Sequence, residues 1–301
     1  MTNTILVASL FPNPFSHVSQ RAAMLAARLN WRHLEYLSVI RPDAAGRPAM
    51  LAQGRQSVDS IKALSHSMTD VKTASAAASL LYGLRCSASF DYGGLHEASC
   101  RRAGEVSPAL IAIAWQSHPW WPVLHNVGLM RDIARHSMKP VLLVRQAPRQ
   151  CYAHAVYPCD FSSESVATLS RAIRLMPYTR ITVLHAYKVP GEGQMRAAGV
   201  KNGAIEHYRE GVERDARHAY ARMLEELKLD ASRLSLALMP KRPHSSCDSY
   251  VNAVGADLII LSDSGGWRVD EWCRQSRMRG LVAHTSSDIL MVHSLRASRG
   301  A

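Results

Sequence analysis

Two short stretches of the sequence decide the fold: residues 131–144 read RDIARHSMKPVLLV, and residues 279–292 read RGLVAHTSSDILMV. In each, an arginine, apolar residues, a histidine and a small hydroxyl residue precede a closing apolar run. The stretches begin 148 positions apart, and two similar openings, ILVASLF at 5–11 and AVYPCDF at 155–161, lie 150 positions apart. Spacing of this kind indicates two copies of one unit of about 150 residues. The polar, proline-containing segment 145–151 is the expected linker.

Within each copy, apolar runs alternate with segments of helical periodicity. Nearly continuous apolar strands that alternate with helices are typical of a parallel sheet covered on both faces. We therefore predict an α/β fold of two tandem doubly wound parallel-sheet, Rossmann-like domains, at 1–147 and 151–295. The predicted strands are 4–9, 34–40, 85–90, 110–114 and 140–144 in the first copy, and 154–159, 180–186, 234–239, 258–261 and 289–292 in the second.

The segments between the strands differ in the strength of their signals. Residues 162–165 (SSES) supply N-cap candidates for a helix that follows, and apolar residues recur at helical spacing over 205–227. Residues 245–254 and 269–284 are predicted as further helices. Residues 41–66 lack a clear period, so we expect a loop there.

The composition excludes several classes of protein. No apolar run approaches the ~20 residues of a membrane helix, and the N-terminus lacks the features of a signal peptide, so we expect a cytoplasmic protein without a membrane partner. The six cysteines form no C-x-x-C pair, which argues against structural zinc and a disulfide framework. The net charge of +12 fits either a solvated basic surface or an anionic partner. No nucleic-acid-binding motif accompanies this charge, so we expect no specific nucleic-acid site.

Four short motifs of the second copy resemble those of one protein family. They are CDFS at 159–162, VLHA at 183–186, ADLIILS at 256–262 and RGLVAH at 279–284. Together with the tandem repeat, they make the chain similar to universal stress proteins in their two-domain form. The resemblance implies an adenine nucleotide alpha-hydrolase-like fold and a regulatory or protein-interaction role in the stress response. It also implies that the two copies pack as an intramolecular pseudo-dimer with 141–144 and 289–292, the last strands, as the candidate interface, and that the chain has a protein partner or self-associates through its last strands.

Nucleotide-binding members of that family carry Gly-x2-Gly-x9-Gly-Ser/Thr after the fourth strand. In the second copy the corresponding residues are Ser262, Gly265, Gln275 and Ser276, so two glycines are lost. Glycines in such a loop let the backbone approach phosphates, and a Gln275 side chain would occupy that space. In the first copy, the equivalent positions hold Ala114, Ser117, Val127 and Gly128, and the position of Asp160 holds Leu10.

The resemblance therefore implies a nucleotide site in the second copy only, with no cofactor certain and ATP as the candidate. Asp160 would face the ribose or the adenine edge, the backbone of Ala186 the adenine, and Gly265 with Ser276 the phosphates. Each residue also has a structural interpretation: Asp160 as a helix cap, Gly265 as a turn glycine and Ser276 as a surface hydroxyl. If these prevail, the chain is a regulatory protein in which nucleotide binding is weak or lost. If the site is intact, it is an ATP- or small-ligand-binding sensor.

Aromatic residues and histidines suggest no catalytic group. Trp115, Trp120 and Trp121 surround His118 in the loop after the fourth strand. They could stack on a ring ligand, but bulk that fills a degenerate pocket or packs against the other copy is the favoured interpretation. His136 and His284 hold equivalent positions in the two copies, which suggests a structural hydrogen bond, and His185 is expected to be a satisfied core histidine. No nucleophile or metal motif is present, so we predict no enzyme and no metal site.

Overall fold

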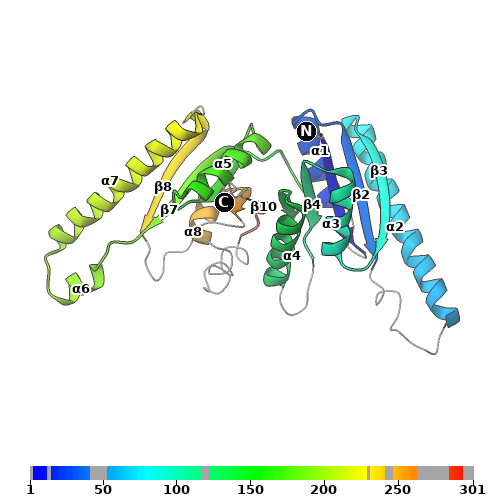
Figure 1. Cartoon of the computed structure of the whole chain (residues 1–301), viewed down its shortest axis with the longest axis horizontal. Helices are drawn as coiled ribbons and strands as arrows, with labels where there is room; N and C mark the ends of the chain where they lie inside the picture. The colour runs from blue at the N-terminus through cyan, green and yellow to red at the C-terminus, as the bar shows by residue number, and fades with distance from the viewer. Residues whose placement is uncertain are drawn as a thin grey trace, which may run out of the picture. The chain divides into compact units, whose positions relative to one another are not determined.

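The computed structural model of the chain describes residues 3–11, 15–40, 53–116, 122–228, 231–240, 247–262 and 285–293, without the side chains of 53–63, 122–124 and 231. By its internal contacts the chain divides into two compact units (Figure 1). The first contains Met1–Cys151 and, from the far end of the sequence, Asp288–His293. The second begins at Tyr152 and contains the described residues up to Ser287. The last strand of the chain therefore groups with the first unit.

The first unit is a sheet with the strand order β3-β2-β1-β4-β5-β10. All pairs are parallel except β5 with β10, where Leu142 lies opposite Leu290 in an antiparallel register. The strands are β1 (Thr4–Leu10), β2 (His33–Ile40), β3 (Arg85–Tyr92), β4 (Leu110–Ala114), β5 (Val141–Val144) and β10 (Asp288–Val292). The helices are α1 (Ser16–Arg28), α2 (Gln53–Tyr82), α3 (Leu95–Val106) and α4 (Pro122–Ser137).

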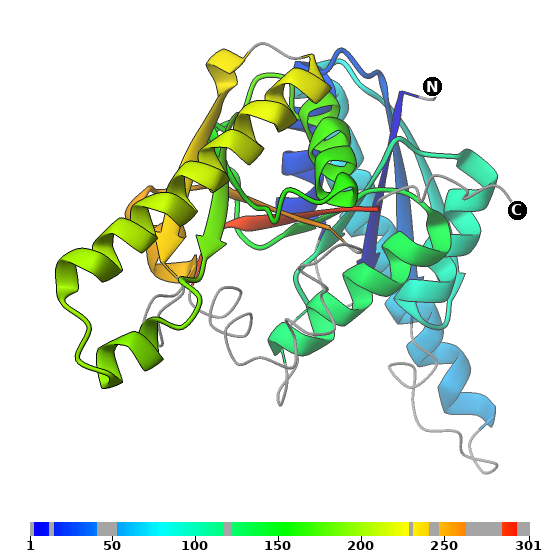
Figure 2. The same cartoon turned by 60° about the vertical axis from the view of Figure 1, so that its left-hand side comes forward.

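The second unit is a parallel sheet with the order β9-β6-β7-β8. The long helix α7 lies along β7 and β8, as Figures 1 and 2 show. The strands are β6 (His154–Pro158), β7 (Arg180–Tyr187), β8 (Leu234–Pro240) and β9 (Leu258–Ser262). The helices are α5 (Ser163–Leu175), α6 (Glu192–Ala197), α7 (Asn202–Leu227) and α8 (Cys247–Ala253), with a short 3-10 turn at Ala231–Arg233.

Adjacent residues of β2 show how the sheet of the first unit is covered. Side chains alternate between the two faces of a strand, so Glu35 and Tyr36 point in opposite directions. The Tyr36 hydroxyl contacts Ser19 of α1 and the carbonyl of Ala74 in α2, whereas the Glu35 carboxylate binds Arg102 of α3. Helices α1 and α2 therefore cover one face and α3 the other. Burial on both faces is the physical reason why the strands read as continuous apolar runs.

The predicted α/β fold and the ten predicted strands are confirmed, with boundaries that differ by at most two residues. The predicted helices over 205–227 and 245–254 correspond to α7 and α8. The helix predicted over 269–284 lies outside the described residues. Among the helices that are described, none has both the length and the apolar character needed to cross a membrane.

The loop predicted over 41–66 is wrong in its second part, because α2 begins at Gln53. Residues 41–52 are outside the described part of the chain. In the part of α2 whose side chains are described, the buried positions are Ser67, Val71 and Ala78. Such a narrow contact stripe of small residues leaves little apolar periodicity to detect, because most of the helix faces water. The helical signal in this part of the sequence is therefore weak, although α2 has 30 residues.

Candidate functional site

The carboxyl ends of β6, β7 and β9 meet at one edge of the second unit's sheet, because these strands are parallel. Ligands of open α/β sheets bind at this edge. Asp160 follows β6, His185 and Ala186 lie near the end of β7, and Ser262 ends β9. Of the residues that the resemblance assigns to a nucleotide site, the structure therefore brings Asp160 and Ala186 to the same edge. Gly265 and Ser276, like Gln275, lie outside the described residues.

Asp160 is bound to the beginning of α5. Its Oδ1 accepts hydrogen bonds from the backbone N–H of Ser162 at 3.0 Å, the Ser162 hydroxyl at 2.7 Å and the Ser165 hydroxyl at 2.6 Å. Ser162, the N-cap of α5, accepts in turn from the backbone N–H of Ser165 at 3.2 Å. Asp160 thus braces the capping residue, and its Oδ2 makes no hydrogen bond with the part of the chain that is described.

These hydrogen bonds also set the charge of Asp160. Partial burial would raise the pKa of its carboxyl, but the hydroxyls of Ser165 and Ser162 and the Ser162 N–H more than offset this and hold the pKa below its usual value. The carboxylate is therefore ionised at neutral pH. A group that is so readily ionised and so well bound is a weak proton acceptor, which makes Asp160 a poor general base.

The rings of Phe161 and His185 contact each other at the same edge as Asp160. Phe161 has a φ of 60°, a left-handed conformation that is uncommon for a bulky residue, and its ring centroid lies 4.7 Å from that of His185. The Nδ1 of His185 donates to the carbonyl oxygen of Cys159 at 2.8 Å, because a carbonyl can only accept. The ring is half-buried. His185 is thus a hydrogen-bonded structural histidine, as predicted, although it is not fully enclosed.

The backbone of Ala186 extends past the end of its neighbouring strand. Pairing of β6 with β7 ends with Pro158 opposite Leu184, and the N–H of Cys159 binds the carbonyl of Leu184 at 2.9 Å. On its other side Ala186 pairs with Met239 of β8. The side of Ala186 toward β6 therefore lies beyond that strand, which is the arrangement that an adenine edge needs for backbone contact.

Ser262 stands where binding members of the family have their first phosphate-loop glycine. Its hydroxyl lies 3.0 Å from the hydroxyl of Thr168, a fully buried residue of α5. The side chain thus ties the end of β9 to α5. This contact gives Ser262 a structural role at a position where a bare backbone would serve a phosphate.

At the corresponding edge of the first unit, the described residues that hold the motif positions are apolar or bonded within the protein. Leu10, at the position equivalent to Asp160, is buried at the end of β1. After β4, the backbone N–H of Gln116 donates to the Oδ1 of Asn126 at 2.7 Å, and the Nδ2 of Asn126 donates to the Gln116 carbonyl at 2.8 Å. Val127, which replaces a glycine of the motif, is also buried. The fully buried Asn126 therefore takes the backbone N–H of Gln116, a donor that a phosphate would need.

The tryptophan loop is described only at its beginning. The guanidinium of Arg145 lies 4.3 Å from the centroid of the Trp115 ring, a cation–π contact within the first unit. His118, Trp120 and Trp121 lie outside the described residues. The prediction of a structural hydrogen bond for His136 is confirmed, since its Nδ1 lies 2.8 Å from the carbonyl of Asp132. Its counterpart His284 is not among the described residues.

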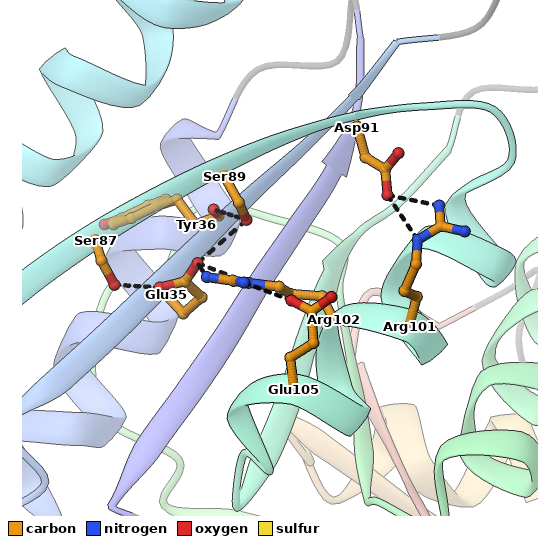
Figure 3. Close-up of polar contacts among 8 residues, drawn as sticks. All are labelled: Glu35, Tyr36, Ser87, Ser89, Asp91, Arg101, Arg102 and Glu105. Carbon is orange, nitrogen blue, oxygen red and sulfur yellow. Dashed lines mark hydrogen bonds and ion pairs between the residues drawn. The ribbon is translucent and has the colours of Figure 1, made fainter.

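Sequence reasoning missed the most buried charge among the described residues of the first unit. The carboxylate of Glu35 in β2 accepts from Nε of Arg102 at 3.0 Å and from the second terminal nitrogen at 2.6 Å, and the hydroxyls of Ser87 and Ser89 also donate to it (Figure 3). Figure 3 also shows the neighbouring, more exposed pair of Arg101 with Asp91. A charged residue in the middle of an apolar strand was the available signal, because such a residue needs a partner when buried.

Comparison with known proteins identifies the fold. No family model and no curated protein matches the sequence. Among solved structures, a putative universal stress protein from Pseudomonas aeruginosa UCBPP-PA14 is 14% identical, with a TM-score of 0.56 over 97% of this chain and 93% of that one. A universal stress protein from Archaeoglobus fulgidus DSM 4304 is 12% identical, with a TM-score of 0.57 over 96% and 97%. A functionally unknown protein from Pseudomonas aeruginosa PAO1 is 14% identical, with a TM-score of 0.57 over 97% and 93%.

These similarities extend over both halves of the chain and define its class as an α/β protein of tandem Rossmann-like architecture. More specifically, the chain has the fold of a two-domain universal stress protein. The resemblance inferred from the sequence motifs is thereby confirmed at the level of the fold.

Proposed function

We propose that this chain acts as a tandem universal stress protein of the cytoplasm, with a regulatory or protein-interaction role in which nucleotide binding is weak or lost. The observation that carries the proposal is the set of contacts among the described residues at the corresponding edge of the first unit. There Leu10 stands at the position equivalent to Asp160, and the Asn126 side chain is hydrogen-bonded to the backbone N–H and carbonyl of Gln116. A phosphate only accepts hydrogen bonds, so it would have to displace Asn126 from the backbone N–H of Gln116.

The second unit supports the same proposal less completely. Asp160 already accepts three hydrogen bonds from Ser162 and Ser165, and Ser262 is bound to Thr168. The side chains at positions where a nucleotide contact is expected therefore hold α5 against the sheet. The replacement of two motif glycines by Ser262 and Gln275 further weakens the case for a phosphate site.

One arrangement favours the alternative, an ATP- or small-ligand-binding sensor that uses only the second unit. The Oδ2 of Asp160 makes no hydrogen bond with described residues, and the backbone of Ala186 extends past β6 at the same edge. A ribose hydroxyl and an adenine edge could use these two groups without disturbing α5.

The proposed role includes no catalysis. The hydroxyls of Ser162 and Ser165 donate to Asp160, whose lowered pKa makes it a poor base for activating them. The Nδ1 of His185 donates to a backbone carbonyl, so it cannot accept a proton from a hydroxyl. At this edge, the described side chains thus form no activated nucleophile.

Thermal unfolding of the full chain with MgATP separates the two functions. The regulatory proposal predicts no stabilisation at millimolar MgATP, whereas an intact site with ligand at a hundredfold excess over its Kd would stabilise the protein by about 2.7 kcal/mol. Titration calorimetry should include Asp160→Ala and, as a control, Asp215→Ala, which changes an exposed acid of α7. Micromolar binding that is lost only in Asp160→Ala, or a nucleotide retained through purification and seen by native mass spectrometry, would establish the sensor instead.

A further inference from the structure

A pocket of about 310 Å³ lies between α1 and α2 of the first unit. Phe15, Ser19 and Ala23 line it from the side of α1. The Ser19 hydroxyl lies 2.7 Å from that of Tyr36, and the Phe15 and Tyr36 rings meet edge to face, so this wall is held in place by the sheet beneath it. The pocket is separate from the carboxyl edge of the second unit, and its interpretation does not rest on the function proposed above.

The wall formed by α2 has a graded chemical character. Its lining residues recur every three or four positions and therefore lie on one side of the helix. Asp70 is at one end, Ala74 and Ala77 are in the middle, and Leu81 is at the other end. At ~1.5 Å per residue, Asp70 and Leu81 are roughly 16 Å apart along the helix. The pocket is thus elongated, with an acidic end, an alanine floor and an apolar end.

Two independent features indicate that this pocket takes a ligand. Leu81 is 74% exposed although it lines an apolar pocket, so its side chain is available for burial against a bound molecule. At the opposite end, the Asp70 carboxylate forms no ion pair or hydrogen bond with any described residue, in a chain of net charge +12. Because no described residue supplies a counter-ion to this acid beside the apolar surface, the pocket is complementary to a cation that carries an apolar group.

We propose that the pocket binds a small amphiphilic amine. Its ammonium group pairs with Asp70, and its alkyl or aryl part lies over Ala74 and Ala77 and covers Leu81. The volume is at the lower end of the range of small-molecule sites, roughly 300–1,000 Å³, which favours a small organic ligand over a protein segment.

Dansylcadaverine is a suitable probe, because it joins an aromatic group to a primary amine through a five-carbon chain and fluoresces more strongly in apolar surroundings. We expect saturable binding to the full chain. N-pentyl dansylamide, which lacks the amine, should bind about fivefold more weakly, as expected for a partly exposed ion pair. In Asp70→Asn the two probes should bind alike, whereas Asp215→Asn, on an exposed face of α7, should preserve the preference.

A second pair of variants tests the position of the apolar part. Ala77→Phe should fill the pocket and reduce binding of both probes at least tenfold. Ala76→Phe places the same ring at the adjacent exposed residue, which does not line the pocket, and should leave binding unchanged. Circular dichroism should confirm that both variants fold, and Asp70→Asn tests the proposal independently if either does not.

Three outcomes would overturn the proposal: no binding of dansylcadaverine by the wild type, equal affinity for the two probes in the wild type, or equal binding by Ala77→Phe and Ala76→Phe. Sedimentation with and without the probe adds a further test. A concentration-dependent dimer that dissociates in Ala77→Phe would show that a second copy of the chain, rather than an amine, covers the pocket.

Discussion

Glu35 has only 2% of its side chain exposed, whereas its partner Arg102 has 28%. Loss of the arginine would therefore leave a charge buried beside two serine hydroxyls. We predict that Arg102→Ala lowers the free energy of unfolding by about 3 kcal/mol, and that Glu35→Gln costs less, because an amide leaves no buried charge. The control is Arg101→Ala, which removes the exposed pair with Asp91 and should cost no more than about 1 kcal/mol. Urea unfolding measures all three, and equal losses for Arg101→Ala and Arg102→Ala would contradict the argument.

Asp160 gives a prediction of pH dependence at the same scale. Because its pKa is lower in the folded than in the unfolded state, its stabilising contribution is full above the unfolded value of about 4 and is lost as the pH falls through the folded pKa. Asp160→Asn should therefore be less stable than the wild type at pH 7, and the difference should shrink below about pH 4. Urea unfolding between pH 7 and pH 3.5 tests this. A difference that is constant across that range would show that the carboxylate charge contributes nothing.

At the scale of elements, β10 is held by a buried ion pair to α1 and by a hydrogen bond to the residue after β5, as well as by backbone pairing with β5. Asp288 accepts from Nε of Arg21 at 3.2 Å and from the backbone N–H of Arg145 at 2.8 Å, and the side chains of Arg21 and Asp288 are both more than nine-tenths buried. Asp288→Ala would leave both donors without this acceptor. We expect a cost of about 3–5 kcal/mol and release of the strand from its neighbour.

Hydrogen exchange measures this release directly. Amides of β5 (Val141–Val144) should exchange faster in Asp288→Ala, while those of β2, which is paired with β1 and β3, should remain protected. Unchanged exchange in β5 would mean that backbone pairing alone holds β10. The same pairing shows why β5 has no free edge within the described sheet: it lies between β4 and β10.

At the scale of the whole molecule, the net charge of +12 predicts nonspecific attraction to polyanions. Without a nucleic-acid-binding motif, the affinity for duplex DNA should be independent of sequence and should fall steeply as counterions compete. Fluorescence anisotropy with two unrelated duplexes at rising salt tests both features. A complex that distinguishes the duplexes and survives about 200 mM salt would show a specific site instead.

The sequence by itself determined the class of fold, the positions of the strands and the tandem repeat. Burial on both faces makes the inner strands apolar runs, although the edge strands β3 and β8 are more exposed, and such runs can be read in chain order without knowledge of their neighbours. Through the family resemblance, the sequence motifs also nominated Asp160 and Ala186, and the structure brings both to one edge of the sheet. The helix α2 was partly missed, because a narrow stripe of small buried residues such as Ala78 carries little periodicity.

Only the tertiary structure decided how those residues are used. Asp160 binds the hydroxyls that begin α5, Asn126 binds the backbone of Gln116, and Glu35 pairs with Arg102, 67 positions away. The final strand likewise joins the first unit through Asp288 and Arg21, which are 267 positions apart. These contacts depend on rotamers and on packing between segments distant in the chain. Composition and periodicity describe neighbours along the sequence, so they carry no record of such partners.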